Sequence, residues 1–254
     1  MASVVGPTAP LGARPRRYTP LHDVVRIFNA VAGRRGRPSP PEFPRIGPVH
    51  FQPIEWELAP IEHFIGGRLL NAGCGNRDIA PFAGAHGAAA VVNYDIASEL
   101  PGAIIGPLKQ MPFGDGDFDT ILCNAVLEHV EFLDAVMRQL VRVLRPGGHL
   151  IVSIPFLQPF HPVPRDFRRF TREGVWQLGG DHGLEVLAVH PVHSITQTLG
   201  WITWEYLREK HSRVRSALLY PILWCFTRYC CRTDHVVTGP VNTFQAVYRK
   251  PGAP

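Results

Sequence analysis

The sequence predicts an α/β domain in which helices cover both faces of a mostly parallel sheet. Residues 68–72 form a short apolar run that ends in the Gly-Cys-Gly turn at residues 73–75. A second apolar run, residues 88–94, ends at Asp95, about 20 residues after the turn. Residues 133–144 carry apolar side chains at positions i, i+3, i+4 and i+7, which indicates a helix packed on a sheet. A strand, a glycine turn and an acid at the end of the next strand are typical of a nucleotide-cofactor site.

The first 66 residues are expected to lie outside this core. We expect residues 1–20 to be a disordered tail and residues 21–66 to contain N-terminal helices and a Pro-rich linker. Within that segment the pattern predicts an amphipathic helix over residues 21–31, the linker over residues 37–48 and a second apolar-periodic stretch over residues 54–64. This second stretch is expected to cover the cofactor site.

Residues 67–190 are expected to form the cofactor-binding core. Thr171 is predicted to cap a helix that ends at Leu178, before a pair of glycines. Residues 242–254 are expected to hold the last strand and the C-terminal tail. The predicted strands cover residues 68–72, 88–94, 120–124, 149–154, 184–190 and 243–249.

The residues after the second glycine separate two classes of cofactor. A dinucleotide fingerprint needs a third glycine where this chain has Asp78, and the Asp78 carboxylate would lie near a pyrophosphate. A nicotinamide cofactor is therefore disfavoured. S-adenosylmethionine carries no phosphate, so small residues beside its methionine part and a carboxylate for its ribose suffice. Gly73, Gly75 and Asp95 supply these groups.

Segments beyond the glycine turn resemble class I S-adenosylmethionine-dependent methyltransferases of the small-molecule, methyltransferase type 11-like group. Residues 111–119 resemble the group's LPF-x-D-x-x-FD signature, residues 125–130 its LEH-type segment and residues 145–148 its RPGG turn. The resemblance spans residues 67–190. It implies a Rossmann-like seven-stranded sheet with an antiparallel last strand, S-adenosylmethionine as cofactor, and in-line methyl transfer to a small-molecule, glycan or lipid-linked acceptor.

The resemblance also implies which residues bind the cofactor. Asp95 would hold the ribose, and the backbone of Leu108 would hold the adenine edge. The family usually has an acid where this chain has Asn71, and many relatives have an adenine-binding Asp where it has Pro107. These departures leave open an alternative, a cofactor-binding scaffold protein with weak or no activity. The expected cofactor-binding residues are Asn71, Gly73, Cys74, Gly75, Asp95, Leu108, Asn124, Ala125 and His129.

Substrate chemistry is expected in residues 155–171, which leave the carboxyl end of a strand where doubly wound sheets bind ligands. This segment resembles the H-x-x-P-x-D-x-x-R-[YF]-T stretch of bacterial relatives from polysaccharide and secondary-metabolite pathways. His161 is the candidate general base, and Asp166 either orients it or pairs with Arg169, the candidate substrate contact. Alternatively, the acid and the arginine form a structural ion pair and His161 fills the cleft wall. His129 is a second candidate base.

Residues 191–241 form an insertion before the last strand that the bare fold does not need. It is rich in apolar and aromatic side chains, such as Trp201 and Trp204, and is expected to be helical. We expect it to cover the substrate cleft or to form a homodimer contact. Arginines within residues 201–228 leave a second interpretation open, a peripheral helix in the membrane interface. No run of 18 apolar residues exists, so no membrane span is expected.

Composition limits the compartment and the partners. The 254-residue chain has a net charge of +5. It contains five cysteines, and an odd number of cysteines favours a reducing compartment and a cytoplasmic protein. The basic clusters lack interleaved aromatic residues, so the sequence shows no specific nucleic-acid signature, although the positive charge leaves an anionic lipid or a nucleic acid open as a partner. Three cysteines and His235 lack the spacing of a structural zinc site, so no metal is expected. These cysteines are Cys225, Cys230 and Cys231.

Overall fold

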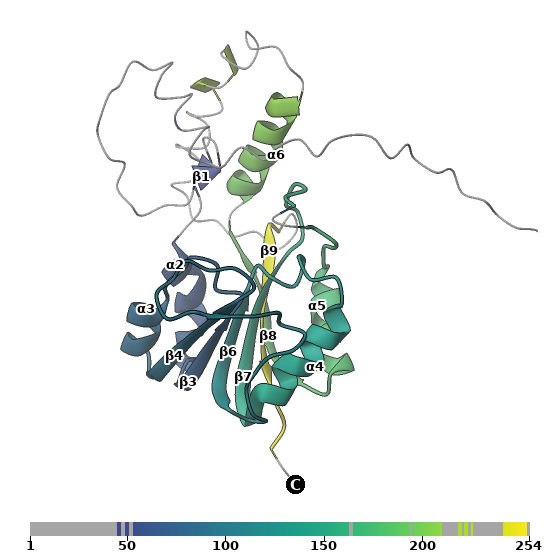
Figure 1. Cartoon of the computed structure of the whole chain (residues 1–254). Coiled ribbons are helices and arrows are strands. Elements are labelled where there is room, and N and C mark those ends of the chain that lie inside the picture. Colours follow the sequence, from purple (N-terminus) through teal and green to yellow (C-terminus); the bar gives the residue numbers. More distant parts are fainter. Residues whose placement is uncertain are drawn as a thin grey trace, which may run out of the picture. The chain divides into compact units, whose positions relative to one another are not determined.

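The computed structural model describes most of the chain beyond residue 52 (Figure 1). All described residues belong to one compact unit, Glu42–Pro254. The predicted tail over residues 1–20, the helix over residues 21–31 and most of the linker lie outside them, as do Cys230, Cys231 and His235. The described residues are 45–46, 49–50, 53–162, 165–193, 195–209, 218–219, 221–222, 225 and 241–252.

A seven-stranded sheet forms the centre of this unit, with strand order β5-β4-β3-β6-β7-β9-β8 (Figure 1). The first five strands in this order pair in parallel, whereas β9 pairs antiparallel with both β7 and β8. This arrangement confirms the predicted Rossmann-like sheet. The strands are β3 (Gly67–Ala72), β4 (Ala88–Asp95), β5 (Ile104–Ile105), β6 (Phe118–Asn124), β7 (Leu144–Pro155), β8 (Glu185–Val192) and β9 (Thr243–Arg249).

Helices cover both faces of the sheet, as predicted. Leu140 of α4 packs in the core on one face, and Leu58 of α2 packs in the core on the other. Successive residues of a strand point to opposite faces, so Leu70 of β3 joins the first core and Leu69 the second. The helical elements are α2 (Ile54–Leu58), the 3₁₀-helix η1 (Ala59–Phe64), α3 (Ala80–Ala85), α4 (Leu133–Val143), α5 (Arg172–Asp181) and α6 (Ile195–Glu209).

The structure corrects the predicted end of α5. The helix continues through the glycine pair to Asp181, although the sequence predicted its end at Leu178. A Cβ on Gly179 would lie 2.7 Å from the ring of Tyr248 in β9. The first glycine of the pair is therefore required by close packing of the helix on the sheet and does not end the helix.

Smaller differences concern short or terminal elements. A two-stranded hairpin, β1 (Arg45–Ile46) and β2 (Val49–His50), lies at the end of the predicted linker. Strand β5 was not located from the sequence, because two residues carry no periodicity. Strand β8 reaches Val192, so the insertion begins at His193, and α6 supplies its described helix.

The cap of α5 gives a test of local stability. The Thr171 hydroxyl accepts a hydrogen bond from the Gly174 amide at 3.1 Å, as predicted. We expect Thr171→Ala to lower the free energy of unfolding by about 1 kcal/mol, because the first turn loses its side-chain acceptor. Urea denaturation measures the change. Thr171→Ser keeps the hydroxyl and should retain most of the stability; an equal loss in both variants would contradict the capping role.

Candidate functional site

The glycine turn after β3 adopts the backbone conformation that its composition predicts. Gly73 and Gly75 have φ angles of +75° and +52°, in the left-handed region. A Cβ on Gly73 would lie 2.4 Å from the Val126 side chain, whereas a Cβ on Gly75 would meet nothing within 4 Å. Gly73 is therefore required by packing. Gly75 faces open space beside the turn, which is the space that a cofactor approaching the backbone needs.

Asp95, at the end of β4, lies against this turn as predicted. One carboxylate oxygen accepts a hydrogen bond from the Gly75 amide at 2.7 Å, and the other accepts one from the Ala97 amide at 2.8 Å. Two carboxylate oxygens offer about four acceptor positions, so Asp95 can also accept hydrogen bonds from ribose hydroxyls. The acid thus holds the loop and retains acceptor capacity for a ligand.

Asn71 and Cys74 are buried residues that stabilise the turn from the side of the core. The buried Asn71 amide group donates to the carbonyl of Arg77 at 3.2 Å and to the side-chain oxygen of Asn93 at 2.9 Å. Cys74 is buried, and burial raises the pKa of its thiol. Cys74 is therefore a packing residue with little thiolate character. Direct contact of either side chain with a cofactor stays a prediction.

Tyr94 positions the segment expected to meet adenine, and sequence reasoning missed it. Its hydroxyl donates to the Pro107 carbonyl at 3.2 Å, and its buried ring packs edge-on against Phe113. A Cβ on Gly106 would lie 2.3 Å from that hydroxyl, so a glycine is needed there. The Leu108 side chain is buried in the core, which leaves its backbone for the predicted adenine contact.

The end of β6 carries Asn124 and Ala125. The Asn124 amide group donates to Glu57 of α2 at 3.3 Å. Its side-chain oxygen is buried and has no hydrogen-bond partner among the described residues, so it can accept a donor from a ligand. Ala125 has a φ of +55° and donates its amide to the Ser153 carbonyl at 2.9 Å, which fixes a sharp turn.

Glu57 is a second residue that sequence reasoning missed, because it belongs to no motif. It lies 3.2 Å from His193. Burial acts to raise the pKa of Glu57, but the charges of His193 and Arg77 and the hydrogen bonds from His193 and Asn124 outweigh it and lower the pKa. Through these contacts α2 lies beside the end of β6; the cover of the cofactor site by residues 54–64 stays a prediction.

Asp166 and Arg169 form the predicted ion pair, with Asp166 Oδ2 2.7 Å from Arg169 Nη2. The same oxygen accepts the backbone amide of His161 at 2.9 Å. Burial acts to raise the pKa of Asp166, but Arg169 and the His161 amide outweigh it and hold the pKa at about 2. Arg169 also donates to the Pro159 carbonyl at 2.9 Å, so its guanidinium links the beginning of the loop to Asp166. Its contact with substrate stays a prediction.

Of the two roles predicted for Asp166, the structure shows the pair with Arg169, and a backbone carbonyl lies closer to the His161 ring than the acid does. His161 Nδ1 lies 2.8 Å from the Pro159 carbonyl but 3.7 Å from Asp166. The backbone carbonyl therefore orients the ring, and Nε2 points to Glu128 at 3.9 Å. Burial acts to lower the pKa of His161, but Glu128, Pro159 and Asp166 outweigh it and raise the pKa. The role of His161 as a general base stays a prediction.

His129 lies beside His161, with ring centroids 5.1 Å apart. Its Nδ1 lies 2.5 Å from the Arg165 carbonyl, and its Nε2 lies 3.7 Å from Glu128. Glu128 is fully buried and was not singled out in the sequence. Trp201 of α6 covers this group from the insertion, with its ring centroid 5.2 Å from that of His161. The structure thus brings both candidate bases together with a buried acid.

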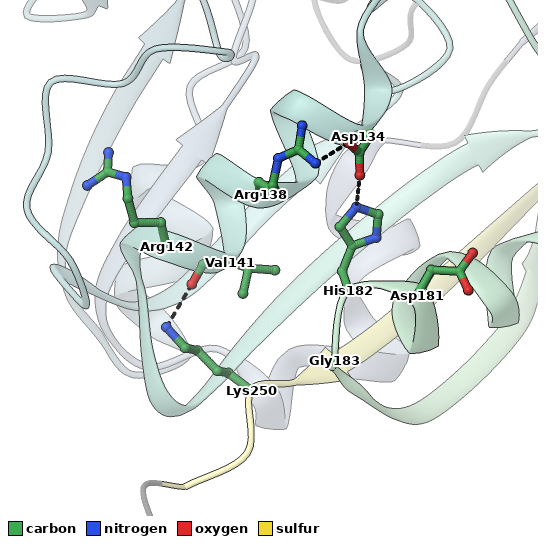
Figure 2. Close-up of a pocket in the computed structure, with 8 residues that line it drawn as sticks. All are labelled: Asp134, Arg138, Val141, Arg142, Asp181, His182, Gly183 and Lys250. Carbon is green, nitrogen blue, oxygen red and sulfur yellow. Dashed lines mark hydrogen bonds and ion pairs between the residues drawn. The ribbon is translucent and has the colours of Figure 1, made fainter.

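A separate hollow of about 590 Å³ lies between α4, the end of α5 and Lys250 (Figure 2). His182 lies 3.1 Å from Asp134 across it, and Lys250 donates to the Val141 carbonyl at 2.8 Å. None of the predicted site residues lines this hollow. Its polar groups join the helices to the last strand and have a structural role.

Comparison with known proteins identifies the family. Residues 41–218, more than half of the chain, match the family model of the methyltransferase domain. The chain belongs to this methyltransferase family. The class I fold of the family implies binding of S-adenosylmethionine, and the predicted resemblance is confirmed.

Individual relatives are more distant. A 2-phytyl-1,4-naphtoquinone methyltransferase of Synechococcus elongatus is 30% identical over 122 residues, covering 41% of this chain and 52% of that protein. A ubiquinone biosynthesis O-methyltransferase of Xanthomonas euvesicatoria is 28% identical over 145 residues, covering 50% of this chain and 58% of that protein. The chain therefore spans about half the length of these relatives. The crystal structure of the cyclase SpnF has a TM-score of 0.55 at 20% identity, covering 92% of this chain and 94% of that one, and shows the same fold.

Of the helices in the described part of the methyltransferase chain, none combines the length and apolar character that a bilayer span requires. Cys225 is an exposed free cysteine. The predicted membrane contact and homodimer contact through residues 201–228 stay predictions.

The two glycines of the turn give a matched pair of variants. We expect Gly75→Ala to lower the free energy of unfolding by about 1–2 kcal/mol, from the left-handed backbone alone. Gly73→Ala should lose about 1–3 kcal/mol more, because its new methyl group would overlap Val126. Urea denaturation of both variants measures the difference. Equal losses would contradict the packing assigned to Gly73.

The Asp166 ion pair predicts a pH-dependent stability. Because the pKa of Asp166 falls from its ordinary 3.8 to about 2 in the folded protein, its stabilising effect is present above pH about 4 and is lost as the pH falls toward 2. The stability advantage of the native protein over Asp166→Asn should therefore shrink between pH 4 and 2. Urea denaturation across this range tests it, with Asp181→Asn, at an exposed position, as control. A constant advantage would contradict the ion-pair role.

Proposed function

We propose that this protein is an S-adenosylmethionine-dependent methyltransferase that acts on a hydroxyl-bearing small-molecule acceptor, with glycan and lipid-linked acceptors in the same chemical class. The observation that carries the proposal is the contact of the Asp95 carboxylate with the Gly75 amide, beside the open space at Gly75. This pairing supplies a ribose acceptor and an unobstructed backbone within one turn. It fits S-adenosylmethionine in a chain of the methyltransferase family.

The residues of the turn support binding of this cofactor, which supplies an electrophilic methyl group. Asp95 accepts hydrogen bonds from the ribose hydroxyls, and the buried side-chain oxygen of Asn124 accepts one from the amino group of the methionine part. The backbone at Leu108, held in place by Tyr94, receives the adenine edge. Gly73 and the buried Cys74 keep the turn closely packed.

The acceptor is proposed to lie beside His161 and Trp201, below α6. The two curated relatives are named for methylation in naphthoquinone and ubiquinone chemistry, and an aromatic hydroxyl compound would match the aromatic wall that Trp201 provides. His161 Nε2 is the atom that would accept the hydroxyl proton, because Nδ1 is hydrogen-bonded to Pro159. A general base of this kind contributes about 10²–10⁴-fold to the rate.

A cofactor-binding protein without methyl transfer is the alternative. The cyclase SpnF has the same fold, so the fold alone does not define the reaction. Asn71 and Pro107 stand where the family usually has acids. On α6, Leu199, Ile202 and Tyr206 are exposed while Trp201 is buried. This outward face is the place at which a membrane surface or a second copy would bind.

Calorimetric titration with S-adenosylmethionine, S-adenosylhomocysteine and NAD tests the proposal. We expect the first two to bind and NAD not to bind. Asp95→Ala should weaken binding at least tenfold, because the ribose loses its acceptor and the Gly75 amide loses its partner.

Asp115→Ala is the matched control, since Asp115 is an exposed acid paired with Arg142 outside the turn. Transfer of labelled methyl groups to a panel of quinols and phenols follows for the protein that binds the cofactor. Binding without transfer to any acceptor would favour the scaffold alternative, and failure of a folded protein to bind either compound would overturn the cofactor site.

A further inference from the structure

Glu128, His129 and His161 form a cluster in which the candidate base His161 and the predicted cofactor contact His129 lie beside a buried acid. Their ligating atoms all lie within 4.8 Å of one another. Glu128 and His129 follow the end of β6, and His161 follows the end of β7, so two neighbouring strands supply the group. The Nε2 atoms of His129 and His161 lie 3.7 Å and 3.9 Å from the same oxygen of Glu128.

Both imidazole rings are held in the tautomer that binds metal ions. His129 Nδ1 contacts the Arg165 carbonyl and His161 Nδ1 contacts the Pro159 carbonyl, at 2.5 Å and 2.8 Å. A carbonyl oxygen only accepts hydrogen bonds, so each Nδ1 carries a proton, and in the neutral ring each Nε2 keeps a lone pair. Metal-binding histidines usually have such a partner on the second nitrogen. Both Nε2 atoms lie within 4 Å of the carboxylate.

Glu128 supplies an independent observation. Its side chain is fully buried, and neither carboxylate oxygen has a hydrogen-bond partner among the described residues. The two histidine nitrogens are too far away for hydrogen bonds. A buried carboxylate needs either a proton or a positive charge nearby, and either a protonated histidine or a metal ion can supply that charge here. A metal ion held by all three side chains would place its charge next to this carboxylate.

The spacing agrees with a bound ion. Donor atoms at about 2.0–2.2 Å from one metal ion lie roughly 3–4 Å apart. Both separations from Glu128 fall in this range, and the third separation, between the two histidines, is within 4.8 Å. Two imidazole nitrogens with one carboxylate favour a first-row transition metal ion, whereas Ca²⁺ and Mg²⁺ prefer oxygen ligands. Three protein ligands leave coordination positions open, as in catalytic sites.

We propose that Glu128, His129 and His161 bind one divalent first-row transition metal ion, of the Zn²⁺, Mn²⁺ or Fe²⁺ class, beneath Trp201. The site is distinct from the C-terminal cysteines whose spacing argued against a metal. The proposal does not depend on methyl transfer. An ion here occupies Nε2 of His161, so metal binding and the general-base role exclude each other at the same moment.

The test uses the full-length chain after treatment with a chelator. Calorimetric titration with Zn²⁺ and Mn²⁺, together with the visible absorption of bound Co²⁺, should give one ion per chain. Glu128→Gln, His129→Gln and His161→Gln should each weaken binding at least tenfold. Metal addition should also raise the melting temperature of the native protein and not that of the variants.

His86→Gln is the matched control. His86 forms a pair with Glu62 at 3.1 Å, like the histidines of the cluster, but the described residues place no third ligand there. Circular dichroism verifies folding; if Glu128→Gln does not fold, the half-buried His129 and His161 carry the test. Absence of binding to the native protein, or binding that persists in both histidine variants, would overturn the proposal and leave a buried Glu-His ion pair.

Discussion

The alignment of parallel strand ends at one edge of the sheet is the constraint on which the rest of the structure depends. Asn71 of β3 pairs with Asn93 of β4 and with Leu122 of β6, so these three strands reach the edge together. Because of this register, the Gly75 amide in the turn after β3 meets the Asp95 carboxylate at the end of β4. A shift of one residue would turn every side chain of a strand to the opposite face and separate the two groups.

The acids at this edge differ in how their charge is compensated. Asp166 pairs with Arg169 and Glu57 pairs with His193, and the pKa of each acid lies below its ordinary value. Glu128 is as deeply buried but has no hydrogen-bond partner among the described residues. Because burying an unpaired charge is costly, Glu128 is the acid on which the proposed metal site rests.

Long elements were predictable because each contains enough residues to show the hydrophobic periodicity of a strand or a helix. Strand β9 covers residues 243–249 as expected, and α4 begins at Leu133 as expected. Short elements show no such periodicity. Strand β5, for example, is defined only by the pairing of two residues with the end of β4. The prediction for Gly179 was wrong because a glycine near the end of a helix can either end the helix or allow close packing against a neighbouring element. The contact with Tyr248, which is distant in the sequence, shows that Gly179 allows close packing.

The sequence by itself determined the fold class, the glycine turn and Asp95, because these features depend on the periodicity of single elements and on the spacing of the turn and the acid along the chain. Only the tertiary structure decided that the Pro159 carbonyl orients His161 and that Glu128 lies between two histidines. Those contacts join loops after different strands. Their partners are set by the order in which β6 and β7 lie in the sheet, and no local pattern of residues encodes that order.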